Sequence, residues 1–161
     1  MARVGQQGYY TALACPNGHV TTSMLELSPE DDQPHCSECG EKTIRECPSC
    51  GAPIHGSPGD VAVWGYSPPK YCHACGAAYP WTAAALASGN ELASMLEGLS
   101  PAERQSLVAS FDDLTRDTPR TAVAVLRTKT LLGRLTREGA VALRQVLVAV
   151  ATDEVKRQMG L

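Results

Sequence analysis

The sequence predicts a small β module in the first half of the chain and an α-helical region in the second. All seven cysteines of the 161 residues lie before residue 76, and glycine, proline and aromatic residues are also concentrated early. Beyond Trp81 the chain becomes rich in Ala, Leu and Val, and Phe111 is its one aromatic residue. This change in composition predicts a boundary, with a compact module at residues 1–81 and a helical region at 82–161.

The cysteines come in pairs with the spacing of metal ligands. Three Cys-x-x-Cys turns are each followed by glycine, which can adopt the positive φ that most residues avoid. The remaining cysteine lies upstream of these turns and pairs with a histidine, with three residues between the two. Eight donors of these types fill two tetrahedral zinc sites and leave no thiol over. The predicted ligands are Cys15, His19, Cys36, Cys39, Cys47, Cys50, Cys72 and Cys75.

The order of the pairs allows two arrangements. Sequential pairing joins the first pair to the second and the third to the fourth, whereas interleaved pairing joins the first to the third, as in cross-braced RING domains. We favour sequential pairing because two local loop closures cost less chain entropy than two interlocked ones. The module is then double zinc-ribbon-like and holds two Zn2+ ions per chain, although a site of four thiolates also suits iron.

Both sites are coordinatively full, which indicates a structural rather than a catalytic role for the metal. The His-Glu-x-x-His motif is absent, and the residues before the Cys-x-x-Cys turns are His35, Glu46 and Tyr71, where zinc deaminases have proline. We therefore predict no enzymatic activity. An odd number of cysteines and a start without an apolar leader argue against disulfides and favour reduced thiols in the cytoplasm.

Within the module we expect short strands between the metal-binding turns. Residues 1–14 lead into the first pair, 20–27 have the composition of a strand, and 61–64 read Val-Ala-Val-Trp. Residues 29–34 form an acidic turn. The aromatic and proline residues of 64–71 either cover the small core or form a protein-binding surface. Three further histidines are expected at the surface or in packing contacts: His35, His55 and His73.

Capping residues mark the expected helices. Thr82 is expected to cap a helix that runs to about Glu97. Ser100-Pro101-Ala102-Glu103 has the pattern of a capping box, and Thr118-Pro119 repeats this start. Residues 119–159 are expected to form one kinked helix or two. Their apolar segment predicts burial, and because few neighbours are available we expect self-association.

The two parts differ in charge. Residues 1–81 carry four Lys and Arg against eight Asp and Glu, and bound thiolates would add negative charge, so a phosphate backbone is repelled. Residues 82–161 are nearly balanced, with ten against nine. Arg120, Arg127 and Arg134 are seven residues apart and share a helix face, which is solvated or meets an acidic partner, anionic lipid or nucleic acid. No apolar run reaches the about 20 residues that span a bilayer.

Seven stretches carry a resemblance to a known family: Cys15-Pro16-Asn17-Gly18-His19, His35-Cys36-Ser37-Glu38-Cys39-Gly40, Cys47-Pro48-Ser49-Cys50, Gly65-Tyr66 through Pro69, Tyr71-Cys72-His73-Ala74-Cys75-Gly76, Pro80-Trp81-Thr82 and Asp117-Thr118-Pro119-Arg120-Thr121. In these stretches the chain resembles the uncharacterised bacterial family known as domain of unknown function 2321. The resemblance implies an intracellular bacterial protein with zinc-ribbon-like repeats before a helical tail. It implies no activity.

The sequence therefore predicts a zinc-stabilised, non-enzymatic adaptor that binds a protein partner and self-associates through residues 119–159. One alternative is a nucleic-acid-binding zinc-ribbon protein that uses the arginines of the helical region. A second alternative is a RING-like ligase module or a metal hydrolase, which would need interleaved sites or an open coordination position.

Overall fold

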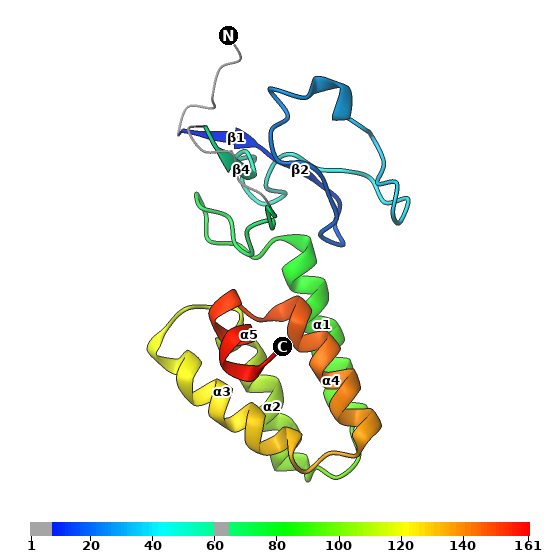
Figure 1. Ribbon diagram of the computed structural model, residues 1–161, viewed down its shortest axis with the longest axis vertical. Coiled ribbons are helices and arrows are strands. Elements are labelled where there is room, and N and C mark those ends of the chain that lie inside the picture. The colour runs from blue at the N-terminus through cyan, green and yellow to red at the C-terminus, as the bar shows by residue number, and fades with distance from the viewer. Residues whose placement is uncertain (1–7, 60–64) are drawn as a thin grey trace. The chain divides into compact units, whose positions relative to one another are not determined.

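The computed structural model describes residues 8–59 and 65–161 (Figure 1). The chain divides into two compact units, residues 1–83 and 84–161, and each has its own buried core. The first unit contains short strands and two groups of metal-ligand side chains, and the second is helical. The predicted fold class, a small β module with two ligand clusters followed by an α-helical region, is confirmed. The strand expected at 61–64 lies outside the described residues.

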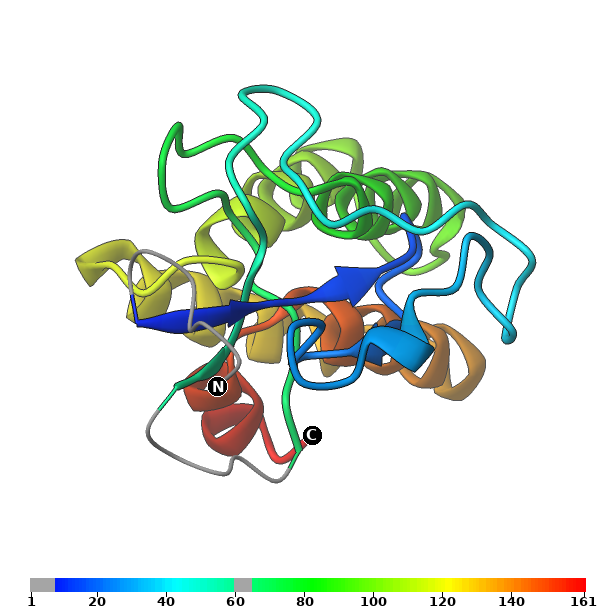
Figure 2. The same cartoon turned by 90° about the horizontal axis from the view of Figure 1, so that it is seen from above.

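The segment of residues 9–14 is the centre of the first unit. Its two short strands follow one another along nearly one line (Figure 2). The first of them pairs with an antiparallel strand from residues 55–58, and the second pairs with the strand that follows the first ligand pair. The strands are β1 (Tyr9–Thr11), β2 (Leu13–Ala14), β3 (Val20–Thr22) and β4 (His55–Pro58).

Backbone hydrogen bonds attach two further segments to residues 9–14. The Ala12 N–H donates to the Ile54 carbonyl at 2.9 Å. Ala14 and Ile44 exchange hydrogen bonds in both directions, at 3.1 and 2.7 Å. The chain between the two ligand groups is therefore pinned to the same central segment, although it forms no strand there.

The strand expected over residues 20–27 ends at Thr22. The chain then turns, and the Ser28 N–H donates to the Met24 carbonyl. This turn brings the Glu26 carboxylate to Thr11, whose N–H and hydroxyl donate to it at 2.8 and 2.6 Å. The Glu26 side chain thus satisfies the Thr11 N–H, and a longer β3 is not needed to supply an acceptor for this backbone donor. The acidic turn contains a 3-10 helix, Pro29–Asp31.

The core of the first unit is small. Among the described residues, its buried large aliphatic side chains are Leu13 and Ile54, and four of its buried members are predicted metal ligands. The rings of Tyr79 and Trp81 stack with their centroids 4.7 Å apart. A core of this size contributes little hydrophobic stabilisation, so the unit needs cross-links of another kind. The buried hydrophobic members are Ala12, Leu13, Ala14, Cys15, Cys36, Cys47, Ile54, Cys72, Tyr79 and Trp81.

The second unit is built from helices. Three of the helices start with proline, whose missing N–H costs nothing at a position without an acceptor. Helices α2 and α3 lie side by side (Figure 1). In the described part of the chain, no helix has the length and apolar character needed to cross a bilayer. The helices are α1 (Pro80–Met95), α2 (Pro101–Leu114), α3 (Pro119–Leu132), α4 (Arg137–Val150) and α5 (Asp153–Met159).

The capping box predicted at Ser100 is present. The Ser100 hydroxyl accepts from the Glu103 N–H at 3.3 Å, and the Glu103 carboxylate accepts from the Ser100 N–H at 2.8 Å. At the start of α3 the same role falls to Thr121, whose hydroxyl accepts from the Thr118 N–H at 2.9 Å. Both helix starts are therefore encoded locally, within four residues of sequence.

Helix α1 begins at Pro80, two residues before the predicted cap. The Tyr79 carbonyl accepts from the N–H groups of Thr82 and Ala83, so the helix follows directly after Tyr79. The Thr82 hydroxyl does not cap the helix. It is buried and donates to the Lys70 carbonyl at 2.9 Å. A hydrogen bond to the Lys70 carbonyl thus replaces the capping hydrogen bond expected for Thr82.

Residues 119–159 form three helices, not one or two. A Thr stands before each new start: the Thr136 hydroxyl accepts from the Gly139 N–H, and the Thr152 hydroxyl accepts from the Val155 N–H. Gly139 therefore lies inside the first turn of α4 and is no interruption. A Cβ there would come within 3.2 Å of a Leu96 methyl group, which explains the glycine by close packing.

The helical core buries one face of each helix. Helix α4 contributes Leu143 and Leu147, which are fully buried, whereas Val141 and Val148 on its other side are about half exposed. Gly89 of α1 lies where a Cβ would meet the Phe111 ring and Val146 at 3.2 and 3.3 Å. The apolar segment that predicted burial is therefore mostly covered within the unit itself.

Replacing Leu147 by Ala should lower the free energy of unfolding of the helical unit by about 2–5 kcal/mol, because it opens a cavity in the core. The matched change Val148→Ala, one residue along on the exposed side, should cost less than about 0.5 kcal/mol. Urea unfolding followed by circular dichroism at 222 nm measures both. Equal effects of the two variants would contradict the described core.

Candidate metal centres

The eight predicted ligands gather into two groups of four. In each group the sulfur and nitrogen donor atoms lie within 4.8 Å of one another. Residues 15, 19, 36 and 39 form the first group, here called site one, and residues 47, 50, 72 and 75 form site two. These are the sets of the sequential arrangement. In the part of the chain that the structure describes, no further group of three or more such side chains is found.

The donor distances in site one match a metal tetrahedron. The Cys15 sulfur lies 3.5 Å from His19 Nδ1 and 3.7 Å from the Cys39 sulfur. The Cys36 sulfur lies 3.6 Å from the same nitrogen. A tetrahedral ion with bonds of about 2.3 Å to sulfur and about 2.0 Å to nitrogen has edges of about 3.8 and 3.6 Å. His19 would therefore bind through Nδ1.

Site two has the same dimensions with four sulfurs. The sulfur atoms of Cys47 and Cys75 are 3.8 Å apart, and those of Cys50 and Cys72 are 3.7 Å apart. A disulfide needs a sulfur–sulfur distance of about 2.05 Å, so these thiols are not oxidised in pairs. The distances are those that one ion would impose on four thiolates, whether the ion is zinc or iron.

The three Cys-x-x-Cys turns share one backbone geometry. In each, the N–H of the first cysteine donates to the carbonyl five residues later, and the glycine N–H donates back to the first cysteine's carbonyl, all at 2.8–2.9 Å. The glycines Gly40, Gly51 and Gly76 have φ between 72° and 76°. A residue with a Cβ disfavours this region, which is the physical reason for glycine after each turn.

The pair of Cys15 and His19 has a related backbone geometry, with one more residue between its two members. The Cys15 N–H donates to the His19 carbonyl at 3.0 Å, and the Gly18 N–H donates to the Cys15 carbonyl at 2.9 Å. Gly18 has φ of 86°, and a Cβ there would lie 3.1 Å from Trp81 Cβ. Trp81 therefore packs directly on the loop that carries two ligands of site one.

In both sites one member of each ligand pair is buried and the other is exposed. The buried members are cysteines that pack inside the unit, and the exposed ones close the site toward solvent. Four protein donors surround each centre, so a tetrahedral ion would have no position left for water or substrate.

Hydrogen bonds separate the thiol pKa values in site one. The backbone N–H of Glu41 and then the Asn17 side chain lower the pKa of Cys39 to about 6. Burial raises the pKa of Cys15. The Cys39 thiol therefore ionises more readily than the Cys15 thiol.

In site two, hydrogen bonds act against burial and neighbouring thiols on the pKa values of the cysteines. Burial raises the pKa of Cys72, but the N–H groups of Cys75 and Ala74 outweigh burial and lower the pKa to about 6. The Ala52 N–H acts to lower the pKa of Cys50, yet neighbouring thiols raise it to about 12. Its sulfur lies 3.7 Å from that of Cys72, and two thiolates repel each other at this distance. A divalent cation removes the repulsion, so the donor set fits a bound metal.

Sequence patterns missed two side chains that lie against the sulfurs. The Asn17 amide donates to the Cys39 sulfur at 3.3 Å. The buried Tyr79 hydroxyl lies near the cysteines of site two, whose sulfurs act on its pKa. Asn17 lies between two predicted ligands in the sequence, and this position could have identified it as a residue close to site one. Nothing in the sequence marked Tyr79.

The histidines outside the ligand groups occupy other positions. His35 is exposed. The rings of His55 and His73 stack at 3.7 Å, and Tyr9 stacks on the other face of His55 at 4.4 Å. Stacking accounts for His55 and His73, in line with the expected packing role.

The segment at residues 65–71 covers the core of the first unit. The Tyr66 hydroxyl donates to the His55 carbonyl, and its ring packs against the buried cluster. The Trp81 indole N–H donates to the Pro69 carbonyl at 2.9 Å. These contacts support the first of the two roles expected for the aromatic and proline residues. Trp64, expected in the same surface, lies outside the described residues.

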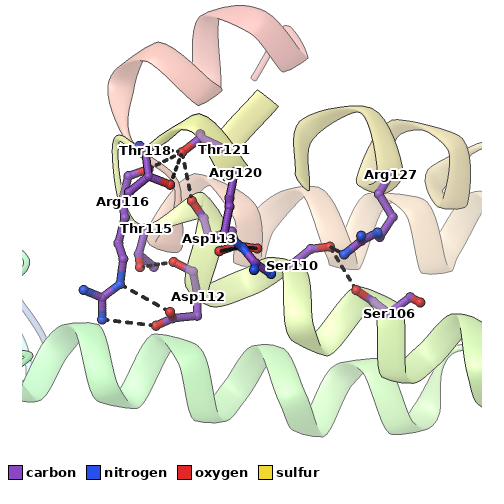
Figure 3. Close-up of polar contacts among 10 residues, drawn as sticks. All are labelled: Ser106, Ser110, Asp112, Asp113, Thr115, Arg116, Thr118, Arg120, Thr121 and Arg127. Carbon is purple, nitrogen blue, oxygen red and sulfur yellow. Dashed lines mark hydrogen bonds and ion pairs between the residues drawn. The ribbon is translucent and has the colours of Figure 1, made fainter. Parts of the chain in front are cut away.

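The three arginines with a spacing of seven each contact a residue of helix α2, and Figure 3 shows the first two, Arg120 and Arg127. Arg120 pairs with the Asp113 carboxylate at 3.1 Å, and Arg127 donates to the Ser110 hydroxyl at 3.3 Å. Arg134 pairs with Glu103. Arg120 and Arg127 lie on α3, but Arg134 follows its last residue, Leu132, so the helix face expected from the spacing does not extend to Arg134. The contacts of the three arginines form a polar seam along α2.

Replacing Gly18 by Ala should destabilise the first unit more than replacing Gly40 by Ala. Both residues have positive φ, which costs a side chain about 1–2 kcal/mol. The Gly40 Cβ would meet nothing within 4 Å, whereas the Gly18 Cβ would displace Trp81, which adds about 1 kcal/mol or more. Urea unfolding followed by tryptophan fluorescence measures both. A Gly40→Ala variant at least as unstable as Gly18→Ala would contradict the Trp81 contact.

Comparison with known proteins connects these features to a family. The family described as "Uncharacterized protein conserved in bacteria (DUF2321)" matches residues 8–159, a range that includes all eight ligands and all five helices. No curated protein and no solved structure matches the chain significantly. The resemblance carried by the sequence motifs is confirmed, and the chain belongs to the bacterial family of domain of unknown function 2321.

Proposed function

We propose that the protein is a zinc-stabilised, non-enzymatic adaptor whose two metal ions are structural. The observation that carries the proposal is the closed donor set of each site, with four protein side chains at the edge lengths of one tetrahedron. A catalytic zinc keeps a coordination position for water or substrate. Thiolate ligands also need a reducing compartment, which favours the cytoplasm.

The order of the ligands favours an adaptor over the enzyme alternatives. A cross-braced ligase module interleaves its ligand pairs, whereas here each ion would join pairs that are neighbours in sequence. A metal hydrolase needs an open position on the metal. Neither requirement is supported by the two donor sets.

Exposed apolar side chains on the helical unit support a role in protein binding. Val123 and Leu126 of α3 are more than half exposed and line a shallow groove of about 320 Å3 together with Arg127 and Arg134. Val141 and Val148 form a second exposed pair on α4. We place a protein partner or a second copy of the chain on these faces, within residues 119–159.

Nucleic-acid binding has weaker support. Arg120 and Arg134 already pair with carboxylates of α2, and Arg127 donates to Ser110. A phosphate backbone would have to displace these partners, and the first unit carries an excess of acidic residues.

Native mass spectrometry of the protein purified without added metal should show two zinc ions per chain. The variant His19→Gln should lose one ion to a competing chelator at concentrations that leave the wild type loaded, because site one then has three donors. The matched variant His35→Gln removes an exposed histidine outside both donor sets and should keep two ions. A wild-type chain without metal, or identical behaviour of both variants, would refute the assignment.

Removing the metal with a strong chelator should unfold the first unit and leave the helices largely intact. Both tryptophans of the sequence lie within residues 1–83, so their emission should shift to longer wavelength. Most of the ellipticity at 222 nm should remain, because helices α2–α5 have their own core. Unchanged tryptophan emission after metal loss would show that the small core suffices without ions.

A further inference from the structure

The hydroxyl of Tyr79 is the least satisfied polar group near site two. The side chain is 1% exposed, and no hydrogen-bond partner of its hydroxyl is found among the described residues. A buried hydroxyl without a partner is costly, because water would otherwise satisfy it. The residue therefore calls for an acceptor that the protein side chains alone do not supply in good geometry.

The groups around this hydroxyl are sulfurs. Tyr79 packs in the same buried cluster as Cys47 and Cys72. Burial raises the pKa of Tyr79, and the Cys72 sulfur raises it further through its contact with the hydroxyl. The hydroxyl nevertheless makes no hydrogen bond among the described residues. A phenol hydroxyl can donate a hydrogen bond, and a cysteine sulfur can accept one.

The ring is held in place from several sides. It stacks on Trp81, whose indole N–H is fixed by the Pro69 carbonyl at 2.9 Å. The Tyr79 N–H donates to the Lys70 carbonyl at 3.0 Å, and its own carbonyl starts helix α1. These contacts restrict the movement of the backbone and of the ring. The hydroxyl is thus held near site two.

We propose that Tyr79 is a positioning residue of site two, whose hydroxyl donates a hydrogen bond to the metal-bound thiolate of Cys72. The inference rests on the proposed metal occupancy of that site. A divalent ion with four thiolates carries a net charge of −2, and a neutral donor on one sulfur spreads this charge without adding a ligand. Asn17 has the corresponding position in site one, where its amide donates to the Cys39 sulfur.

This hydrogen bond has two measurable consequences. It stabilises the lone pairs of the Cys72 sulfur, so transfer of an electron from sulfur to the metal needs more energy. It also lowers the repulsion between thiolates and so favours retention of the ion. Loss of a hydrogen bond to a metal ligand typically weakens metal binding by about 10–100-fold.

The test compares Tyr79→Phe with Tyr66→Phe in the full chain. Each variant removes one tyrosine hydroxyl at the same small core; Tyr66 is partly buried, and its hydroxyl donates to the His55 carbonyl and not to sulfur. Each protein is loaded with Co2+, and its sulfur-to-cobalt absorption band is recorded. Zinc-loaded samples are then titrated with a competing chelator, and the ions released per chain are counted.

Tyr79→Phe should move the absorption band to longer wavelength and make one of the two zinc ions at least about ten-fold easier to remove. Tyr66→Phe should leave both quantities as in the wild type, even if it lowers thermal stability. Unchanged bands and release in Tyr79→Phe, or the same shift in Tyr66→Phe, would overturn the proposal. A wild type that binds no metal in site two would instead refute the proposed function on which it rests.

Discussion

The first unit depends on eight donor side chains more than on its hydrophobic core. Its core buries two large aliphatic side chains and two aromatic rings, and four of its other buried members are predicted metal ligands. Each site closes a loop of chain that forms few strands, and bound metal would supply the folding free energy that the core lacks. This explains why a segment with many glycines and prolines holds a defined shape, with its turns set by the Cys-x-x-Cys geometry.

The same constraint explains the aromatic residues at the end of the unit. Trp81 packs on the Gly18 loop of site one, and Tyr79 stacks on Trp81 and reaches the sulfurs of site two. These two rings therefore link both sites through one packed pair. The start of helix α1 follows from this arrangement, because Tyr79 and Thr82 take their partners from residues next to the last ligand pair.

The helical unit is held together by helix caps and an apolar core, without metal-ligand clusters among its described residues. Capping groups set where α2, α3, α4 and α5 begin, and the core between them is aliphatic with one phenylalanine. Its charged residues mostly pair within the unit: Arg120 of α3 pairs with Asp113 of α2 (Figure 3), and Arg134, which follows α3, pairs with Glu103 of α2. Exposed ion pairs of this kind contribute little to stability, about 0–1 kcal/mol each, but they occupy charges that otherwise attract phosphate. The exposed valines and Leu126 are then the residues that best explain an interaction role.

The sequence alone determined what is local. The pairs of candidate donors, the glycine after each turn, and the helix starts at Ser100 and Thr118 depend on residues within a few positions of one another, and short-range geometry is visible as spacing. Tertiary structure decided what is distant. It ended β3 at Thr22 through Glu26 and Thr11, and it turned the three arginines toward α2. It also placed the Tyr79 hydroxyl against site two. These contacts join residues that are far apart in the sequence and form only when the segments pack together. Sequence periodicity therefore does not reveal them.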